Sequence, residues 1–68
     1  MTPAELKSTR HSLGLSAEAF ARLVRVQSGR TVRKWEAGER DIPGPVLVIL
    51  ETVEAVPEAR EWLLTRAP

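Results

Sequence analysis

Three basic side chains lie close together near the middle of this chain of 68 residues, in the stretch RTVRKWEAG. Arg30, Arg33 and Lys34 are three and four residues apart, so a helix over this stretch would place them on one side. Val32 and Trp35 are also three apart and would form an apolar stripe on the other side. The basic side of such a helix is either simply solvated or is a surface that binds a negatively charged partner.

Charge is segregated along the chain, although the net charge is only +1. Residues 21–34 contain five basic residues and no acidic residue, whereas residues 36–61 contain seven acidic residues and two basic ones. Residues 1–20 balance, and Arg66 adds one positive charge. This asymmetry favours a polyanionic partner for the basic segment. The alternative is a charge dipole with no target.

Composition limits the other kinds of function. The chain has no cysteine, which excludes disulfides and thiolate metal sites, and its one histidine, His11, cannot hold a metal alone. It shows no nucleophile–base pair, phosphate loop or paired carboxylates, so we expect no enzyme and no cofactor. No apolar run approaches a membrane span or a signal peptide. We therefore expect one cytoplasmic domain over residues 1–68, with no membrane or small-molecule partner.

The helix signals predict an all-α fold, a compact bundle of five short helices. Thr2 to Glu5 form a capping box, Ser16 and Ser28 are good N-caps, and Gly14 and Gly38 suit helix ends. The first two expected helices are about 3–13 and about 17–24. The third runs from Ser28 to Gly38, and the fourth has Pro45 at its first position. Pro57 opens the fifth helix, of about 58–66, which lies in a C-terminal segment of about 57–67.

The apolar run VLVIL at 46–50 is ambiguous, because five apolar and largely β-branched residues can also form a strand. A helix is favoured, because the chain offers no second strand and a stripe recurs with helical period. That stripe comprises Val46, Ile49, Leu50, Val53 and Val56.

The stretch LGLSAEAFARLVRVQSGRTVRKWEAGERDIP resembles the Cro/C1-type (xenobiotic-response-element-type) helix-turn-helix family. The resemblance covers residues 3–56, and its ending is similar to that of small phage and mobile-element regulators, such as repressors encoded beside anti-CRISPR genes. The matching features are Leu15-Ser16, Phe20-Ala21, Leu23, Val26, Thr31-Val32 and Trp35-Glu36-x-Gly38. The resemblance implies a lambda-repressor-like bundle, in which helices 2 and 3 are the helix-turn-helix.

The resemblance also implies that the third helix enters the major groove of double-stranded DNA. The DNA-contacting positions would then be Gln27, Ser28, Arg30, Thr31, Arg33 and Lys34. Arg30 is the best base reader, because its guanidinium fits guanine O6 and N7, and Lys34 could also reach guanine. Arg33 would meet phosphate, and the amides that begin this helix would favour a phosphate as well. The alternatives are that Ser28 only caps the helix and that the charges are solvated.

Further phosphate contacts are expected from Ser16, Arg25 and Arg40, although Arg40 could equally pair with Glu36 or Asp41. The sequence departs from the family at three places. Ala17 stands where many members have a phosphate-gripping glutamine, Arg25 replaces the usual glycine of the turn, and the turn is one residue longer. Because the turn is longer, two assignments of the base-contacting positions are open, and they differ by one residue along the chain.

One recognition helix reads few base pairs, so we expect a homodimer that binds a palindromic operator and acts as a repressor, with its own promoter as one candidate target. Apolar residues in excess of one helix face are predicted to form the dimer interface; these are Leu47, Val48, Trp62, Leu63 and Leu64. The alternative is that they close the core of the monomer. The competing function is a protein-binding adaptor or antitoxin-like module, for which DNA binding is secondary.

Overall fold

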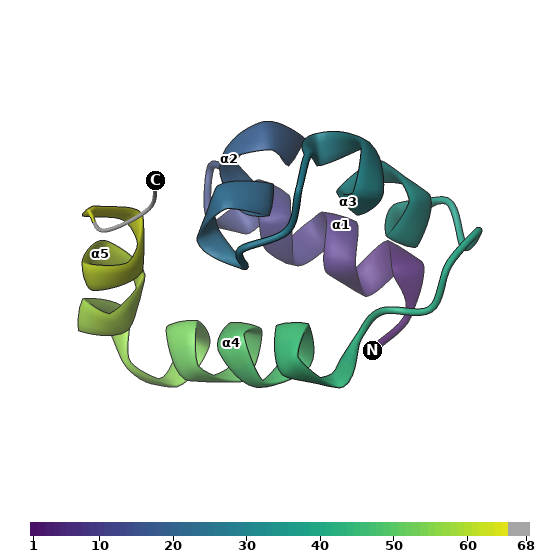
Figure 1. The fold of residues 1–68 in the computed structure, drawn as a ribbon. Helices are drawn as coiled ribbons and strands as arrows, with labels where there is room; N and C mark the ends of the chain where they lie inside the picture. The colour runs from purple at the N-terminus through teal and green to yellow at the C-terminus, as the bar shows by residue number, and fades with distance from the viewer. Residues whose placement is uncertain (66–68) are drawn as a thin grey trace.

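The computed structural model describes residues 1–65, and these residues form an all-α fold without strands (Figure 1). The helices are α1 (Pro3–Ser12), α2 (Ala17–Leu23), α3 (Gly29–Glu36), α4 (Gly44–Ala55) and α5 (Pro57–Thr65). In Figure 1, α2 and α3 lie on one side of α1, α4 runs along the other side, and α5 turns back from the end of α4. α5 contacts α2, which closes the bundle at that end. The all-α prediction is confirmed, and VLVIL is helical.

Local signals set most of the helix ends. Thr2 and Glu5 form the capping box of α1, and the hydrogen bond from the Thr2 backbone lowers the pKa of Glu5. Gly14 and Gly38 follow the ends of α1 and α3 with φ angles of 71° and 77°, in the left-handed conformation that glycine adopts without strain. The start of α4 differs from the prediction, because Gly44 occupies the first helical position.

The C-terminal ends of α4 and α5 bear on two further predicted details. Val56 was expected on the buried stripe of α4, but it is 45% exposed. The reason is that the helix ends at Ala55 and Val56 takes an extended conformation. For α5, the structure shows helix as far as Thr65, and the predicted end at residues 66–67 lies outside the described residues.

The core gathers side chains from the first four helices. Trp35 is only 2% exposed, which confirms that it belongs to the core with Val32. The buried cluster comprises Leu6, Ala17, Phe20, Ala21, Leu23, Val24, Val32, Trp35, Val46 and Leu50. Because α3 inserts two of its side chains into this cluster, its orientation is tied to that of the whole bundle.

An ion pair joins α1 to α3 beside the core. Arg10 Nε lies 2.7 Å from Glu36 Oε2, and Arg10 Nη2 donates to Glu36 Oε1 at 3.1 Å. The third guanidinium nitrogen, Nη1, donates to the carbonyl of Leu15 at 3.0 Å. The two side chains are only 12% and 8% exposed, and the hydrogen bonds to Glu36 raise the pKa of Arg10. This planar, two-bonded pair fastens the C-terminal end of α3 to α1.

Candidate nucleic-acid interface

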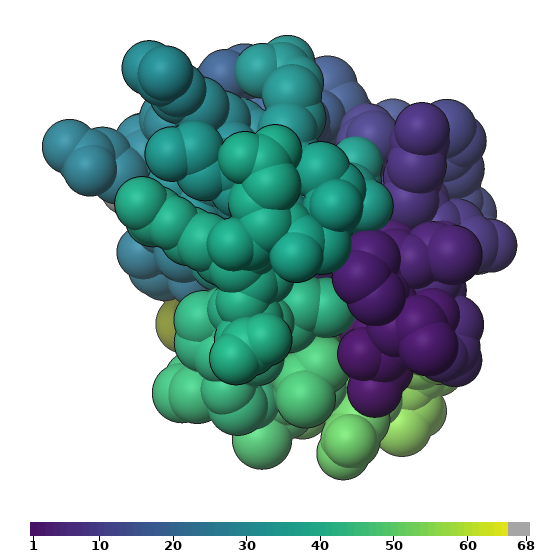
Figure 2. Space-filling model, turned by 90° about the vertical axis from the view of Figure 1, so that its right-hand side faces the viewer, coloured from purple at the N-terminus to yellow at the C-terminus, as the bar shows by residue number. Residues whose placement is uncertain are grey.

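α3 has two distinct sides. Gly29, Val32 and Trp35 are buried against the bundle, while Arg30 and Arg33 are exposed and Lys34 is half-buried. Positions 30, 33 and 34 share one side of a helix, so the three basic groups form a single outward surface. In the space-filling view, side chains of the blue-to-teal part of the chain, which includes this region, project from the body of the molecule (Figure 2).

These basic groups are not engaged within the part of the chain that the structure describes. No hydrogen bond or ion pair among residues 1–65 involves the side chains of Arg30, Arg33 or Lys34. Gln27 is exposed beside them, and Ser28 and Thr31 are half-buried at the edge of the surface. All six positions that the resemblance implied therefore have some exposure, and we call the set 27, 28, 30, 31, 33 and 34 the basic surface.

The turn before α3 has an unusual residue at its centre. Arg25 has a φ of 62°, the left-handed conformation that favours glycine, and it follows the end of α2 at the position where glycine is common. The backbone N–H of Val26 donates to the carbonyl of Ala21 at 2.9 Å, which closes the end of that helix. Arg25 Nη1 donates to the carbonyls of Arg22 and Leu23 at 2.7 and 3.3 Å. Arg25, predicted to contact phosphate, thus stabilises the end of α2.

The cap of α3 is also different from the prediction. Ser28 stands at the N-cap position, but its side chain makes no capping hydrogen bond. Instead, Oε2 of Glu18 accepts a hydrogen bond of 3.1 Å from the backbone N–H of Gly29. A carboxylate therefore already lies at the start of α3, where we expected amides open to a phosphate. Sequence reasoning missed this role, because Glu18 and Gly29 are eleven residues apart.

Gly29 lies in tight contact with the start of α2. A Cβ atom at this position would be 2.8 Å from the backbone nitrogen of Glu18 and 2.9 Å from the carbonyl carbon of Ala17. Backbone atoms cannot move aside as the end of a side chain can, so only glycine fits here. α3 can therefore approach α2 more closely than any other residue type at position 29 would allow.

We expect Gly29→Ala to lower the free energy of unfolding by about 2–3 kcal/mol, because overpacking at backbone contacts forces the helices apart. Gly44→Ala is the matched control, since nothing lies within 4 Å of a Cβ there. The control should raise stability by about 0.5 kcal/mol, because alanine restricts the unfolded chain more than glycine does. Urea unfolding measures both values, and equal effects of the two variants would contradict the close packing.

The other predicted phosphate contacts lie on either side of α3. The Ser16 hydroxyl accepts a hydrogen bond of 3.1 Å from the N–H of Ala19 and so caps α2. Arg40 is exposed just after α3, and within residues 1–65 it forms no ion pair with Glu36 or Asp41, the alternative interpretation; Glu36 pairs with Arg10. Ala17 is 5% exposed and lies in the core.

The predicted dimer residues divide into two groups. Leu63 and Leu64 are partly buried and pack against the core of the monomer, as the alternative interpretation held. Val48 and Trp62 are 61% and 56% exposed, and Leu47 is half-buried. Val48 and Trp62 are therefore the most exposed members of the predicted set.

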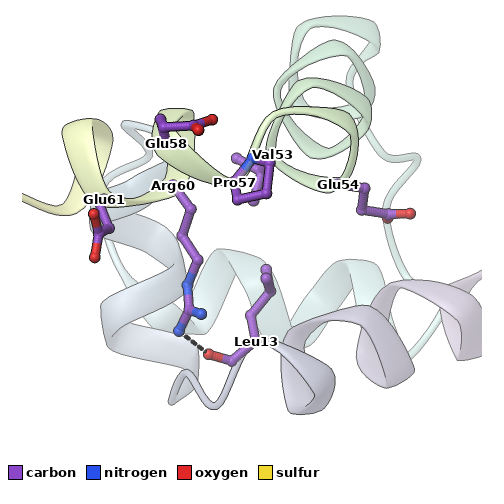
Figure 3. A pocket seen from close by; sticks show the side chains of 7 residues that line it. All are labelled: Leu13, Val53, Glu54, Pro57, Glu58, Arg60 and Glu61. Carbon is purple, nitrogen blue, oxygen red and sulfur yellow. Dashed lines mark hydrogen bonds between the residues drawn. The ribbon is translucent and has the colours of Figure 1, made fainter.

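A hollow lies away from α3, at the corner between α4 and α5 (Figure 3). Arg60 reaches from α5 to the carbonyl of Leu13 and donates a hydrogen bond to it. The hollow is lined by Leu13, Val53, Glu54, Pro57, Glu58, Arg60 and Glu61. The carboxylates of Glu54 and Glu58 point away from the guanidinium in Figure 3. Arg60 thus ties α5 to the end of α1, a contact between residues 47 positions apart.

Comparison with known proteins gave no assignment: no protein-family model matches the chain, and a search of curated proteins found no match. Within residues 1–65, no group of three or more histidine, aspartate or glutamate side chains is placed to hold a metal ion. None of the helices described is long and apolar enough to cross a membrane.

Proposed function

We propose that this protein is a sequence-specific regulator of transcription that binds double-stranded DNA, with α2 and α3 acting as a helix-turn-helix. The observation that carries the proposal is the basic surface. Arg30, Arg33 and Lys34 project from one side of α3, unpaired within residues 1–65, while the other side of that helix is held in the core. An α-helix with side chains is about 10–12 Å wide, which matches the major groove.

The side chains of the basic surface divide into base readers and backbone contacts. Arg30 follows the first residue of α3, and the N-terminal part of a recognition helix comes nearest to the bases. Its guanidinium can donate two parallel hydrogen bonds to guanine, and Lys34, one turn later, can donate to the same edge. Arg33 lies to the side and is placed for phosphate, and Gln27 and Thr31 suit adenine or phosphate.

The acidic half of the chain supports this orientation. α4 runs on the side of α1 away from α2 and α3, and it carries Glu51 and Glu54 (Figure 1). Glu58 and Glu61 are on α5, and all four of these glutamates are exposed. When α3 faces DNA, the acids of α4 are therefore kept away from the phosphates, which would otherwise repel them.

We further propose that two copies bind a palindromic operator in the cytoplasm and repress by occupancy, with the protein's own promoter as one target. The described molecule measures 31 × 23 × 20 Å. We expect the two α3 helices of the dimer to bind half-sites about 34–36 Å apart. The exposed Val48 and Trp62, with Leu47, are the residues proposed for the contact between copies.

The proposed function is tested by selection of duplexes from a random library with the wild-type protein. We expect an enriched palindrome that binds with a dissociation constant that rises steeply with salt, because binding releases counterions from the phosphates. Fluorescence anisotropy at several salt concentrations measures this slope. An absence of enrichment, or binding that does not depend on salt, would contradict the proposal.

The dimer leads to a separate prediction for Val48. Because this side chain is 61% exposed, Val48→Glu should change the stability of the monomer by less than about 0.5 kcal/mol. In a dimer it would place a charge in an apolar contact, and we expect the dimer dissociation constant to rise by at least about tenfold. Light scattering over a concentration series measures this dissociation constant, with Ala4→Glu, at an exposed position of α1, as the control. A wild-type protein that stays monomeric at micromolar concentration would remove the dimer.

A second candidate is the adaptor, in which the exposed part of Trp62 and Val48 binds another protein. The two candidates differ in their dependence on α3. A variant with alanine at positions 30 and 34 should lose DNA binding but still bind a protein partner, because neither position lies on α4 or α5.

A further inference from the structure

The first turns of α2 and α3 touch through one side chain and one glycine. Glu18, in α2, accepts the hydrogen bond from the N–H of Gly29, the first residue of α3. The same glycine is buried and leaves no space for a Cβ against the backbone of Ala17 and Glu18. Ser28, the residue that would ordinarily cap α3, leaves its side chain out of the cap. The start of α3 is therefore held in place by these contacts with α2.

We propose, on the basis of the proposed function, that Glu18 is a positioning residue for DNA recognition. It fastens the start of α3 one residue before Arg30, and its charge keeps a DNA phosphate from binding the amides there. Residues 24–28 form the link before α3, and the hydrogen bond from Gly29 to Glu18 fixes the point at which this link ends. With Glu18 in this position, α3 contacts DNA through the side chains of α3 and not through the backbone amides at its start.

The geometry explains why this position matters for base readout. Arg30 is joined to Gly29 by one peptide bond, so a shift of the Gly29 backbone moves the Cα of Arg30 with it. Two parallel hydrogen bonds to guanine require both donors to be placed together, and a displacement of the helix start breaks one of them. Arg10 and Glu36 hold only the other end of α3 and cannot correct this displacement.

Two substitutions separate position from charge. Glu18→Gln and Glu18→Ala both remove one negative charge, but only glutamine keeps an oxygen that can accept the hydrogen bond from Gly29. The difference between these two variants therefore reports the fastening alone. The difference between glutamine and the wild type reports the charge. Glu54→Gln on α4 changes the net charge equally at a position far along the chain, and serves as the control.

Affinity for the duplex that the wild type enriches from a random library is measured by anisotropy. We expect the glutamine variant to bind about threefold more tightly than the wild type at low salt, with a smaller difference at high salt. We expect the alanine variant to bind about fivefold more weakly than the glutamine variant, the effect of one hydrogen bond. Equal binding by the alanine and glutamine variants would overturn the positioning role.

Selectivity distinguishes positioning from a loss of stability. Each variant is also titrated with a duplex in which one guanine pair of the half-site is replaced. A lower folded fraction weakens binding to both duplexes by the same factor and leaves their ratio unchanged. We expect the ratio to fall in the alanine variant and to be retained in the glutamine variant. An unchanged ratio in the alanine variant would also overturn the proposal.

A measurement without DNA keeps this inference separate from the proposed function. Hydrogen exchange at the Gly29 amide should be slow in the wild type and in the glutamine variant, and at least about fivefold faster in the alanine variant. Equal exchange in all three proteins overturns the contact itself. If exchange behaves as expected but the wild type enriches no duplex, the proposed function fails, and with it the role of Glu18 toward DNA.

Discussion

Replacing Arg30 and Lys34 together with alanine is expected to weaken binding to the selected duplex by at least about a hundredfold. Each good contact to a base edge contributes roughly 1–3 kcal/mol, and this variant removes two of them. It also removes two positive charges, so the dependence of log affinity on log salt should become less steep by about one to two. Because neither side chain has a partner within residues 1–65, thermal unfolding should be nearly unchanged.

Two further variants make this result specific. Lys7→Ala removes a positive charge from the exposed surface of α1 and should weaken binding by less than about threefold. Arg30→Lys keeps the charge but loses the planar pair of donors, so the salt slope should persist while discrimination at the guanine falls. If Lys7→Ala were as damaging as the double variant, the loss would reflect net charge, and α3 would not be the recognition helix.

The Glu36→Ala variant is expected to lose about 3 kcal/mol of stability, the largest effect we predict for a single substitution. It leaves the guanidinium of Arg10, only 12% exposed, without the carboxylate that accepts two of its hydrogen bonds. Removal of one partner of a buried pair typically costs about 3–5 kcal/mol. A domain of this size has a total stability of only about 3–10 kcal/mol, so a large fraction of the variant could be unfolded at 37 °C.

Urea unfolding of a double-mutant cycle measures this effect. Arg10→Ala should be similarly damaging, because it strands Glu36, which is 8% exposed, and also removes the donor to the Leu15 carbonyl. The double variant should lose clearly less than the sum of the two, because no unpaired charge is left. Glu39→Ala, an exposed acid just after α3, should change stability by less than about 0.5 kcal/mol. Strict additivity would contradict the coupling.

The pH dependence of this pair follows from the direction of the pKa change. The pKa of Arg10 is raised above its ordinary value, chiefly by its hydrogen bonds to Glu36. A raised pKa in the folded state means that the stabilising contribution is fully present below the ordinary pKa of arginine, and that it is lost only as pH rises through the higher folded-state pKa. Arg10 therefore keeps the pair charged throughout the neutral and moderately alkaline range.

The sequence by itself determined the helices and the division of α3 into two sides. The capping box of Thr2 and Glu5, the serine at 16, and the glycines at 14 and 38 act within a few residues, and such local signals can be read directly. The period of Val32 and Trp35 likewise predicted which side of α3 is buried, and hence that Arg30, Arg33 and Lys34 face outward. The outward side of α3 was therefore predictable, because it depends on one helix.

Only the tertiary structure decided which polar groups hold that helix in place. Glu36 pairs with Arg10 across 26 residues, and Glu18 caps Gly29 across eleven, so no local pattern identifies either partner. The same holds for the apolar residues of the last two helices, where Leu63 and Leu64 pack on the core and Val48 remains exposed. A sequence period shows that a helix has an apolar side, but the partner of that side depends on where the other helices lie.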